Sequence, residues 1–474
     1  MFKTLANAWK ITELKSKLLF TALIILLYRI GTAITVPFVN ANVVTNYFTS
    51  SDNDIFGLLS TLSSGFESAS LFALGVQPYI TASIVIQLLT VAIPALERLA
   101  KQGEEGKQKI TVITRYVTMG ISVISAIGYY FLIATTSAKG VSALVYDDWY
   151  VAVVMVACFC AGSAIVMWMA EKINEFGIGN GISIILFANI VSRAVSVVQQ
   201  FIYIVRMIID GSNQRWIFDQ LGIGDYYKPG KWDWTYSIPS LLVLLLTTAG
   251  VLALIWFVVY ISDSERRIPV QYAKKVVGRK MYGGRNTNLP LKVNMAGVMP
   301  VIFASSILSL PSMILGFITH KNEFWTNFAN FIAPNTWFYA LMTFILILAF
   351  AYFYVAISFN PVEVASNLQQ NGGSIPGVRP GRPTTMFIKK VLSKVTLIGA
   401  LALSVVSVLP VVVYLILNAI GSAANLPGLM ASYSMVGEFV NSGTSIIIVV
   451  GVVLETVRDL EAQMTMRHYK GFLD

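Results

Sequence analysis

Residues that could carry chemistry are few in this chain and lie mostly between its apolar segments. Two arginines, Arg29 and Arg193, lie well within such segments, and Arg115 lies shortly after the start of another. Both histidines, His320 and His468, fall outside them. A pump or an ion-coupled transporter usually keeps ionisable side chains at mid-membrane to bind and relay ions. The pattern therefore favours a conduit with docking surfaces over a reaction centre.

The apolar segments around these residues are long enough to be membrane helices. Of the 474 residues, 56% are hydrophobic and 12% are charged. A helix needs about 20 residues to cross the hydrocarbon core, and unbroken apolar runs favour helices over a barrel. The sequence predicts an all-α membrane protein with ten spans, at 18–37, 71–93, 111–134, 151–170, 181–201, 239–261, 293–318, 337–358, 395–418 and 437–456.

Lysine and arginine gather on one predicted side of the membrane. With a cytosolic N-terminus, the cytosolic segments hold 25 of the 34 Lys and Arg residues, and the opposite side holds 6. Cytosolic loops of membrane proteins carry such an excess of positive charge. We therefore expect a multi-pass protein of the cytoplasmic (inner) membrane with both termini in the cytosol. We expect no cleavable signal peptide, because the first 17 residues lack a small-residue cleavage site.

Ten spans can be divided into an N-terminal half, 18–201, and a C-terminal half, 239–456. Five spans per half force the halves into opposite orientation, the layout of inverted-repeat membrane proteins. This organisation predicts a functional site between the halves, near the midplane. The other parts are a cytosolic amphipathic helix in 1–17, an outer loop 202–238 and a cytosolic tail 457–474.

The segment Asp54–Ser70 is neither a span nor an ordinary loop. It is rich in Ser and Gly, and its apolar part is far too short to cross a membrane. A re-entrant or interfacial segment of this kind is tolerated at depth where it is buried in protein or lines a cavity. The alternative is a surface helix on the outer face. In the next span, Pro78 removes a backbone donor and favours a bend.

Two long cytosolic loops carry most of the remaining positive charge. Residues 262–292 alternate apolar and polar side chains around Ile268–Tyr272, which predicts a projecting β-hairpin. The sequence GVRPGRP at 377–383 predicts a stiff turn. In one interpretation, these cations set the membrane orientation and contact anionic lipid. In the other, they bind phosphate backbones or an acidic protein surface. The candidate partner-binding residues are Arg266, Arg267, Lys274, Lys275, Arg279, Arg379 and Arg382.

Other classes of protein fit these residues less well. A secondary transporter needs a midplane cluster of ionisable groups, and an intramembrane protease needs catalytic residues at depth. No Asp lies within a predicted span, and the GIGNG sequence at 177–181 lacks the Lys-Ser/Thr of a phosphate-binding loop. Cys158 and Cys160 lie mid-span and support neither a disulfide nor a metal site. We expect no catalytic residue, no metal site and no cofactor.

Five sequence motifs follow one another over nearly the whole chain. They are LFALGVQPYITASIVIQLL (71–89), GIGNGISIILFANIV (177–191), LPLKVNMAGVMPVIFASSI (289–307), GVRPG (377–381) and GTSIIIVV (443–450). Together they resemble the SecY family of central subunits of bacterial protein-conducting channels. The resemblance implies two five-helix halves clamped around an hourglass pore that opens sideways to lipid at one seam.

By this resemblance, six aliphatic residues form a ring at the waist of the pore. Within the second and fifth spans the ring positions are four residues apart, which puts both side chains on one helix face. An aliphatic ring has no polar groups to replace the hydration shell of an ion. For any one of these residues, core packing or a lipid-facing position is the alternative. The residues are Ile80, Ile84, Ile182, Leu186, Ile302 and Ile448.

The resemblance also implies a plug and a lateral gate. The segment Asp54–Ser70 becomes a small plug helix below the ring, displaced when a substrate enters. The lateral gate lies between the second and seventh spans, with Gln87, Thr90 and Asn294 placed to hydrogen-bond across it. The alternative for these three is hydrogen bonding within one helix. The candidate plug residues are Phe56, Leu58, Leu59, Leu62 and Gly65.

The partners implied by the resemblance are proteins, nucleic acid and lipid. Arg379 matches the position that engages the SecA ATPase, and the 262–292 hairpin would reach SecA or the ribosome. SecE and usually SecG are the companion subunits, and unfolded preproteins with their signal peptides are the substrates. Anionic lipids are expected at the basic loops. The outer loop 202–238 and Glu438 receive no role from the resemblance.

Overall fold

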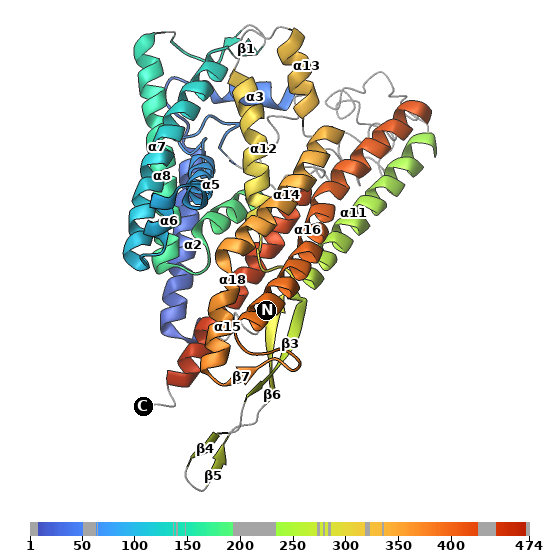
Figure 1. Ribbon diagram of the computed structural model, residues 1–474. Coiled ribbons are helices and arrows are strands. Elements are labelled where there is room, and N and C mark those ends of the chain that lie inside the picture. The colour runs from blue at the N-terminus through green and yellow to red at the C-terminus, as the bar shows by residue number, and fades with distance from the viewer. Residues whose placement is uncertain are drawn as a thin grey trace.

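The computed structural model describes most of the chain, which is largely helical, with short strands at one end (Figure 1). The described residues are 8–50, 63, 65–135, 137–138, 141–146, 148–192, 234–272, 275–277, 280–282, 286–317, 323–333, 336–424 and 442–470.

A helix is present at each of the ten predicted spans. These helices are α2 (Thr12–Ala33), α5 (Gln77–Ala92), α7 (Glu104–Thr135), α8 (Trp149–Phe176), the unlabelled helix Gly181–Ser192, α11 (Trp234–Asp263), α12 (Met299–Phe317), α14 (Trp337–Ser358), α16 (Arg382–Ala424) and α18 (Ser442–Lys470). Over the described residues, five helices are long and apolar enough to cross a membrane, or six if the bent pair α5 and α6 is one span. The all-α membrane class is confirmed.

The remaining elements are short and lie at the two ends of the long helices. The helices are α3 (Ala41–Ser50), α6 (Pro94–Ala100), α13 (Glu323–Ile332) and α15 (Pro361–Gln370). The strands are β1 (Ser137–Ala138), β2 (Val141–Ser142), β3 (Glu265–Tyr272), β4 (Lys275–Val277), β5 (Lys280–Tyr282), β6 (Asn286–Lys292) and β7 (Gly373–Ser374).

The bend that was predicted at Pro78 occurs at Pro94 instead. Pro78 lies in the first turn of α5, where a helix has no partner for the missing N–H, so the helix is not interrupted there. Ile93 is extended, with φ −107° and ψ 115°, as the residue before a proline prefers. The chain therefore turns by 105° between α5 and α6.

The predicted hairpin in 262–292 is confirmed. Strands β3 and β6 pair antiparallel from Glu265 opposite Lys292 to Gln271 opposite Asn286, and β7 joins the other edge of β3. Alternate side chains of β3, Ile268 and Val270, are buried against α15 and the start of α16. The hairpin projects from the end of the molecule at which α2 begins and α18 ends (Figure 1).

Candidate channel site

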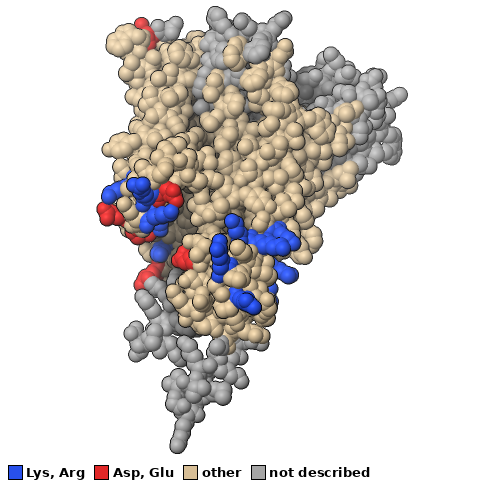
Figure 2. Space-filling model, viewed as in Figure 1, with Lys and Arg blue, Asp and Glu red and all other residues tan. Residues whose placement is uncertain are grey.

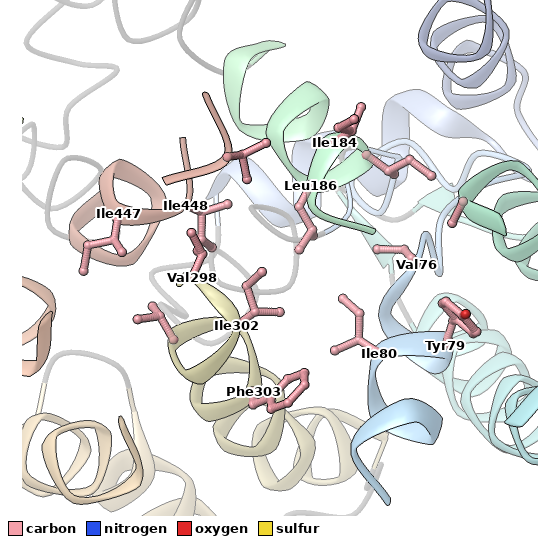
Figure 3. Close-up of a cluster of buried hydrophobic side chains, with 14 of the residues drawn as sticks. Val76, Tyr79, Ile80, Ile184, Leu186, Val298, Ile302, Phe303, Ile447 and Ile448 are labelled. Carbon is pink, nitrogen blue, oxygen red and sulfur yellow. The ribbon is translucent and has the colours of Figure 1, made fainter. Parts of the chain in front are cut away.

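The six predicted ring residues come together in one buried cluster between four helices. Ile80 and Ile84 come from α5, Ile302 from α12 and Ile448 from α18, and each is at most 2% exposed. Leu186 of the helix Gly181–Ser192 is fully buried, and Ile182 of the same helix is partly buried against this cluster. Ile80, Leu186 and Ile302 point toward one region between the helices (Figure 3). Helices far apart in the sequence therefore supply one continuous aliphatic contact.

The aliphatic cluster extends beyond the six residues. Val76 and Val298 are 1% and 3% exposed and belong to the same cluster (Figure 3). Each directly precedes its helix and accepts, through its carbonyl oxygen, the N–H of the ring residue four positions later, Ile80 or Ile302. Sequence reasoning missed both valines, although this spacing could have identified them.

The glycine-rich segment 177–181 positions the helix that carries Ile182 and Leu186. A Cβ on Gly181 would lie 2.0 Å from the carbonyl oxygen of Ala170, so only glycine lets the chain pass α8 this closely. Gly179 has φ +75°, and its N–H donates to Asp459 Oδ2 of α18 at 3.1 Å. The N–H groups of this segment thus bind side chains, which explains the motif without a phosphate.

Two of the polar residues expected at the lateral gate, Gln87 and Thr90, form hydrogen bonds within α5. Gln87 Nε2 donates to Ser83 Oγ at 3.2 Å, and Thr90 Oγ1 donates to the carbonyl of Gln87 at 2.6 Å. Asn294 is half-buried just before α12. A different residue crosses from α5 to α12: Gln77 Nε2 donates to Ser309 Oγ at 2.9 Å. Sequence reasoning missed this pair because neither residue lies in the predicted gate positions.

The plug residues fall in two groups. Phe56, Leu58, Leu59 and Leu62 lie outside the described residues. The following stretch, Gly65–Ser70, forms turns rather than helix and packs into a second buried cluster with α7 and α8.

Phe66 anchors this stretch. Its ring lies 4.5 Å, centroid to centroid, from the ring of Tyr129, whose hydroxyl donates to the Phe66 carbonyl oxygen. A Cβ on Gly65 would lie 1.8 Å from Ser70 Oγ, so the turn is closely packed. The C-terminal end of the predicted plug segment is therefore fixed to the helix bundle.

The basic residues of the two long loops are exposed where the structure describes them. Arg266 and Arg267 lie on β3, and Arg379 and Arg382 lie at the turn before and at the start of α16. Gly377 and Gly381, with φ +81° and +98°, give that turn its shape. Lys274 and Arg279 lie outside the described residues, as does the side chain of Lys275.

Positive charge is distributed unevenly over the end of the molecule that bears the hairpin (Figure 2). Around α6 and α7 each of four cations has a glutamate partner, in the pairs Lys101–Glu97, Lys107–Glu104, Lys109–Glu105 and Arg115–Glu171. The hydrogen bond from Lys101 lowers the pKa of Glu97, so this exposed carboxylate stays ionised. On α16, no described acidic residue pairs with the exposed Lys389, Lys390 or Lys394. These lysines extend the candidate docking surface beyond the residues predicted from sequence.

The root of the hairpin is joined to α18. Arg458 donates to Asp263 Oδ1 at 2.6 Å and also to the carbonyl of Ser262. Burial, followed by the charge of Arg458, lowers the pKa of Lys292 at the end of β6. Arg458 and Asp459 are adjacent, so one turn of α18 contacts both the hairpin root and the loop before the helix Gly181–Ser192.

One of the intramembrane arginines has a partner in the structure. Arg29 Nη2 of α2 donates to the carbonyl oxygen of Ala188, near the end of the helix Gly181–Ser192. Cations near a helix C-terminus interact favourably with its free carbonyls. Arg193 and Glu438 lie outside the described residues.

The helices that supply this aliphatic cluster belong to a chain in which at least five described helices are long and apolar enough to cross a membrane, an arrangement that suits a membrane channel. A family model described as SecY matches residues 70–457. Relatives called protein translocase subunit SecY include one from Streptomyces scabiei, 39% identical with all of both chains covered. Another is from Thermus thermophilus, 36% identical over 100% of this chain and 98% of that one. The chain therefore belongs to the SecY family of protein translocase subunits, and it is a channel subunit rather than an enzyme.

Solved structures have the same fold at low sequence identity. A protein-conducting channel is 16% identical with a TM-score of 0.57, covering 95% of this chain and 92% of that chain. Sec61 from a canine ribosome–channel complex is also 16% identical, with a TM-score of 0.55 and the same coverage.

Proposed function

We propose that this chain passes unfolded secretory polypeptides across the cytoplasmic membrane and releases hydrophobic segments sideways between α5 and α12. A partner motor or a ribosome supplies the energy. The observation that carries this proposal is the buried ring contributed by α5, α12, α18 and the helix Gly181–Ser192.

The ring residues act as the seal of the idle channel. An ion entering a dry aliphatic neck loses water and gains no coordinating group, so the neck is a barrier to ions. Aliphatic side chains hold no fixed hydrogen bonds with one another, so they can move apart around an extended polypeptide of any sequence. Ile80, Ile84, Ile182, Leu186, Ile302 and Ile448 are the residues assigned to this role.

The movable part of the plug ends before Gly65. The residues from Asp54 to Leu62 are assigned to the plug, which leaves its position when a polypeptide enters. The support for this limit is the packing of Phe66 on Tyr129, which holds the turn Gly65–Ser70 in the second buried cluster. A short displaceable segment on a fixed anchor can return to its place after each passage.

The basic hairpin and the turn at Arg379 are assigned to the partners. The lysines at the start of α16 form no ion pair with a described acidic residue, which favours docking there over the α6–α7 region, where the three lysines are paired with glutamates. Related structures include ribosome-bound Sec61, which supports a ribosome as one partner. SecA is the motor assigned to Arg379, SecE and SecG are the companion subunits, and anionic lipids contact the same basic loops. The excess of Lys and Arg places the end of the molecule that bears the hairpin, together with both termini, in the cytosol.

Ion conductance in a planar bilayer tests the seal. The wild-type complex with its companion subunits is compared with three separate variants: a deletion of residues 54–62, the substitution Ile84→Ser and the substitution Leu186→Ser. We expect a silent wild-type channel and ion leak in all three variants. Equal silence in all four, with correctly folded protein, would show that these residues do not line a pore.

A further inference from the structure

The seam between α5 and α12 is closed by a hydrogen bond at the end opposite to the expected gate residues. Among the described residues, Gln77 and Ser309 form the one side-chain hydrogen bond that joins these two helices. Gln77 is 9% exposed and Ser309 is 2% exposed. The Ser309 hydroxyl in turn donates a hydrogen bond to the carbonyl oxygen of Ser306 at 2.8 Å. The contact is therefore a buried polar chain that must break when the helices separate.

The expected gate residues lie far from this contact along α5. Gln77 begins the helix, whereas Gln87 and Thr90 lie in its last turns. Ten residues of helix separate Gln77 from Gln87, which corresponds to about 15 Å. Since Gln87 and Thr90 are bonded within α5, separation of α5 from α12 breaks neither of those bonds.

The turn before Gln77 also holds the anchor of the plug segment. Ser63 Oγ donates to the carbonyl oxygens of Phe72, at 3.3 Å, and of Ala73. Gly75 has φ +54°, and a Cβ there would lie 2.9 Å from Ser63 Oγ. Movement of the start of α5 therefore strains the seat of the plug, and displacement of the plug loosens the start of α5.

We propose that Gln77 is a positioning residue that holds the seam shut at its outer end, through Ser309, and sets how readily a signal peptide opens the channel. This inference rests on the proposed function, because it needs a seam that opens. Polar contacts between helices in a membrane are modest, and loss of one changes an opening equilibrium roughly three- to twentyfold. A signal peptide that inserts between the helices can supply that difference.

The test measures the concentration of a synthetic signal peptide that half-opens the purified complex in a planar bilayer. Gln77→Leu removes the donor, and we expect half-opening at roughly three- to twentyfold lower peptide concentration. The matched control is Gln102→Leu, the same change in the exposed turn before α7, with an unchanged midpoint. The exchanged pair Gln77→Ser with Ser309→Gln restores a donor and an acceptor and returns the midpoint toward wild type.

A double-mutant cycle separates the contact from a general loss of packing. Ser309→Ala removes the acceptor, and the double variant with Gln77→Leu should show no further shift. If the Gln77→Leu variant does not fold, the Ser309→Ala variant tests the same contact. Additive shifts, or equal shifts in Gln77→Leu and Gln102→Leu, would overturn the inference.

Failure of the inference differs from failure of the proposed function. If peptide opens the wild type but Gln77→Leu leaves the half-opening concentration unchanged, Gln77 does not hold the seam shut and the channel function stands. If peptide opens neither the wild type nor the variant lacking 54–62, both proposals fail.

Discussion

At the scale of single residues, glycines decide where helices can meet. Gly181 brings the start of one ring helix against α8. Gly451 brings α18 against Val298, the residue before α12, where a Cβ would lie 2.1 Å from Val298 Cγ2. Sequence reasoning recognised that GIGNG is not a phosphate site. It could not assign the motif to close packing, because the neighbour that demands glycine is distant in sequence.

A methyl group at Gly181 should be strongly destabilising. Gly181→Ala places a carbon 2.0 Å from the backbone oxygen of Ala170, which has no side-chain freedom to move away. We expect a loss of at least about 2 kcal/mol in the free energy of unfolding, seen as a lower melting temperature in detergent. Gly120→Ala is the control: nothing lies within 4 Å of its Cβ position in α7, so it should gain about 0.5–1 kcal/mol.

Tyr129 tests the plug anchor at the same scale. Tyr129→Phe keeps the ring contact with Phe66 but removes the hydroxyl that donates to the Phe66 carbonyl. A buried acceptor without a donor costs about 1–3 kcal/mol, so the anchor should loosen. We expect more frequent brief openings of the idle channel in single-channel recordings. Tyr130→Phe, on the neighbouring half-buried tyrosine, is the control and should open no more often than wild type.

At the scale of elements, α18 connects parts that the sequence assigns to different halves. Its residues Arg458 and Asp459 bind the hairpin root and the loop before the helix Gly181–Ser192. Gln463, one turn later, donates to Asp459 and accepts from Lys17 of α2. One turn of α18 thereby joins the hairpin root to the loop that precedes a helix of the ring.

Loss of Asp459 should loosen this joint. Asp459→Ala leaves the N–H of Gly179 and the amide of Gln463 without their acceptor. Because the site is partly exposed, we expect a modest loss, about 1 kcal/mol, measured as a lower melting temperature. Glu461→Ala, an exposed acid on the same helix, should have a smaller effect. An equal effect of both changes would remove Asp459 from the joint.

Elements were predicted best where one local signal dominates. Apolar runs gave helices at all ten predicted positions, and alternation around Ile268 gave the hairpin. The bend was misplaced at Pro78, because a proline breaks a helix only where the lost hydrogen bond would otherwise form. The Gln77–Ser309 contact could not be predicted, because it depends on how two helices far apart in sequence are packed.

At the scale of the whole molecule, charge separates one end from the rest. On the face drawn in Figure 2, the charged side chains gather toward the end that bears the hairpin, and the surface above them is largely uncharged. The six ring residues were assigned by resemblance, and their convergence in one cluster is the feature of the assembled molecule that agrees with it most closely. The division into halves at 18–201 and 239–456 stays a prediction.

Sidedness can be tested by labelling single cysteines after replacement of Cys158 and Cys160 by serine. Asn288→Cys on the exposed hairpin should react with a membrane-impermeant maleimide in inverted membrane vesicles only. Val145→Cys, exposed near the opposite end beside β2, should react in intact spheroplasts only. The reverse pattern would place the hairpin outside and exclude cytosolic partners there.

The central claim is that a polypeptide passes through the ring. It is tested most directly by placing a photoreactive amino acid at Ile302 and, as a control, at Ile398 of α16, which lies outside the ring cluster and is 62% exposed. A secretory preprotein is then stalled during transport and the membranes are irradiated. The account predicts a crosslink to the preprotein from position 302 and none from 398. Crosslinks from 398 alone, or from neither position while transport proceeds, would contradict it.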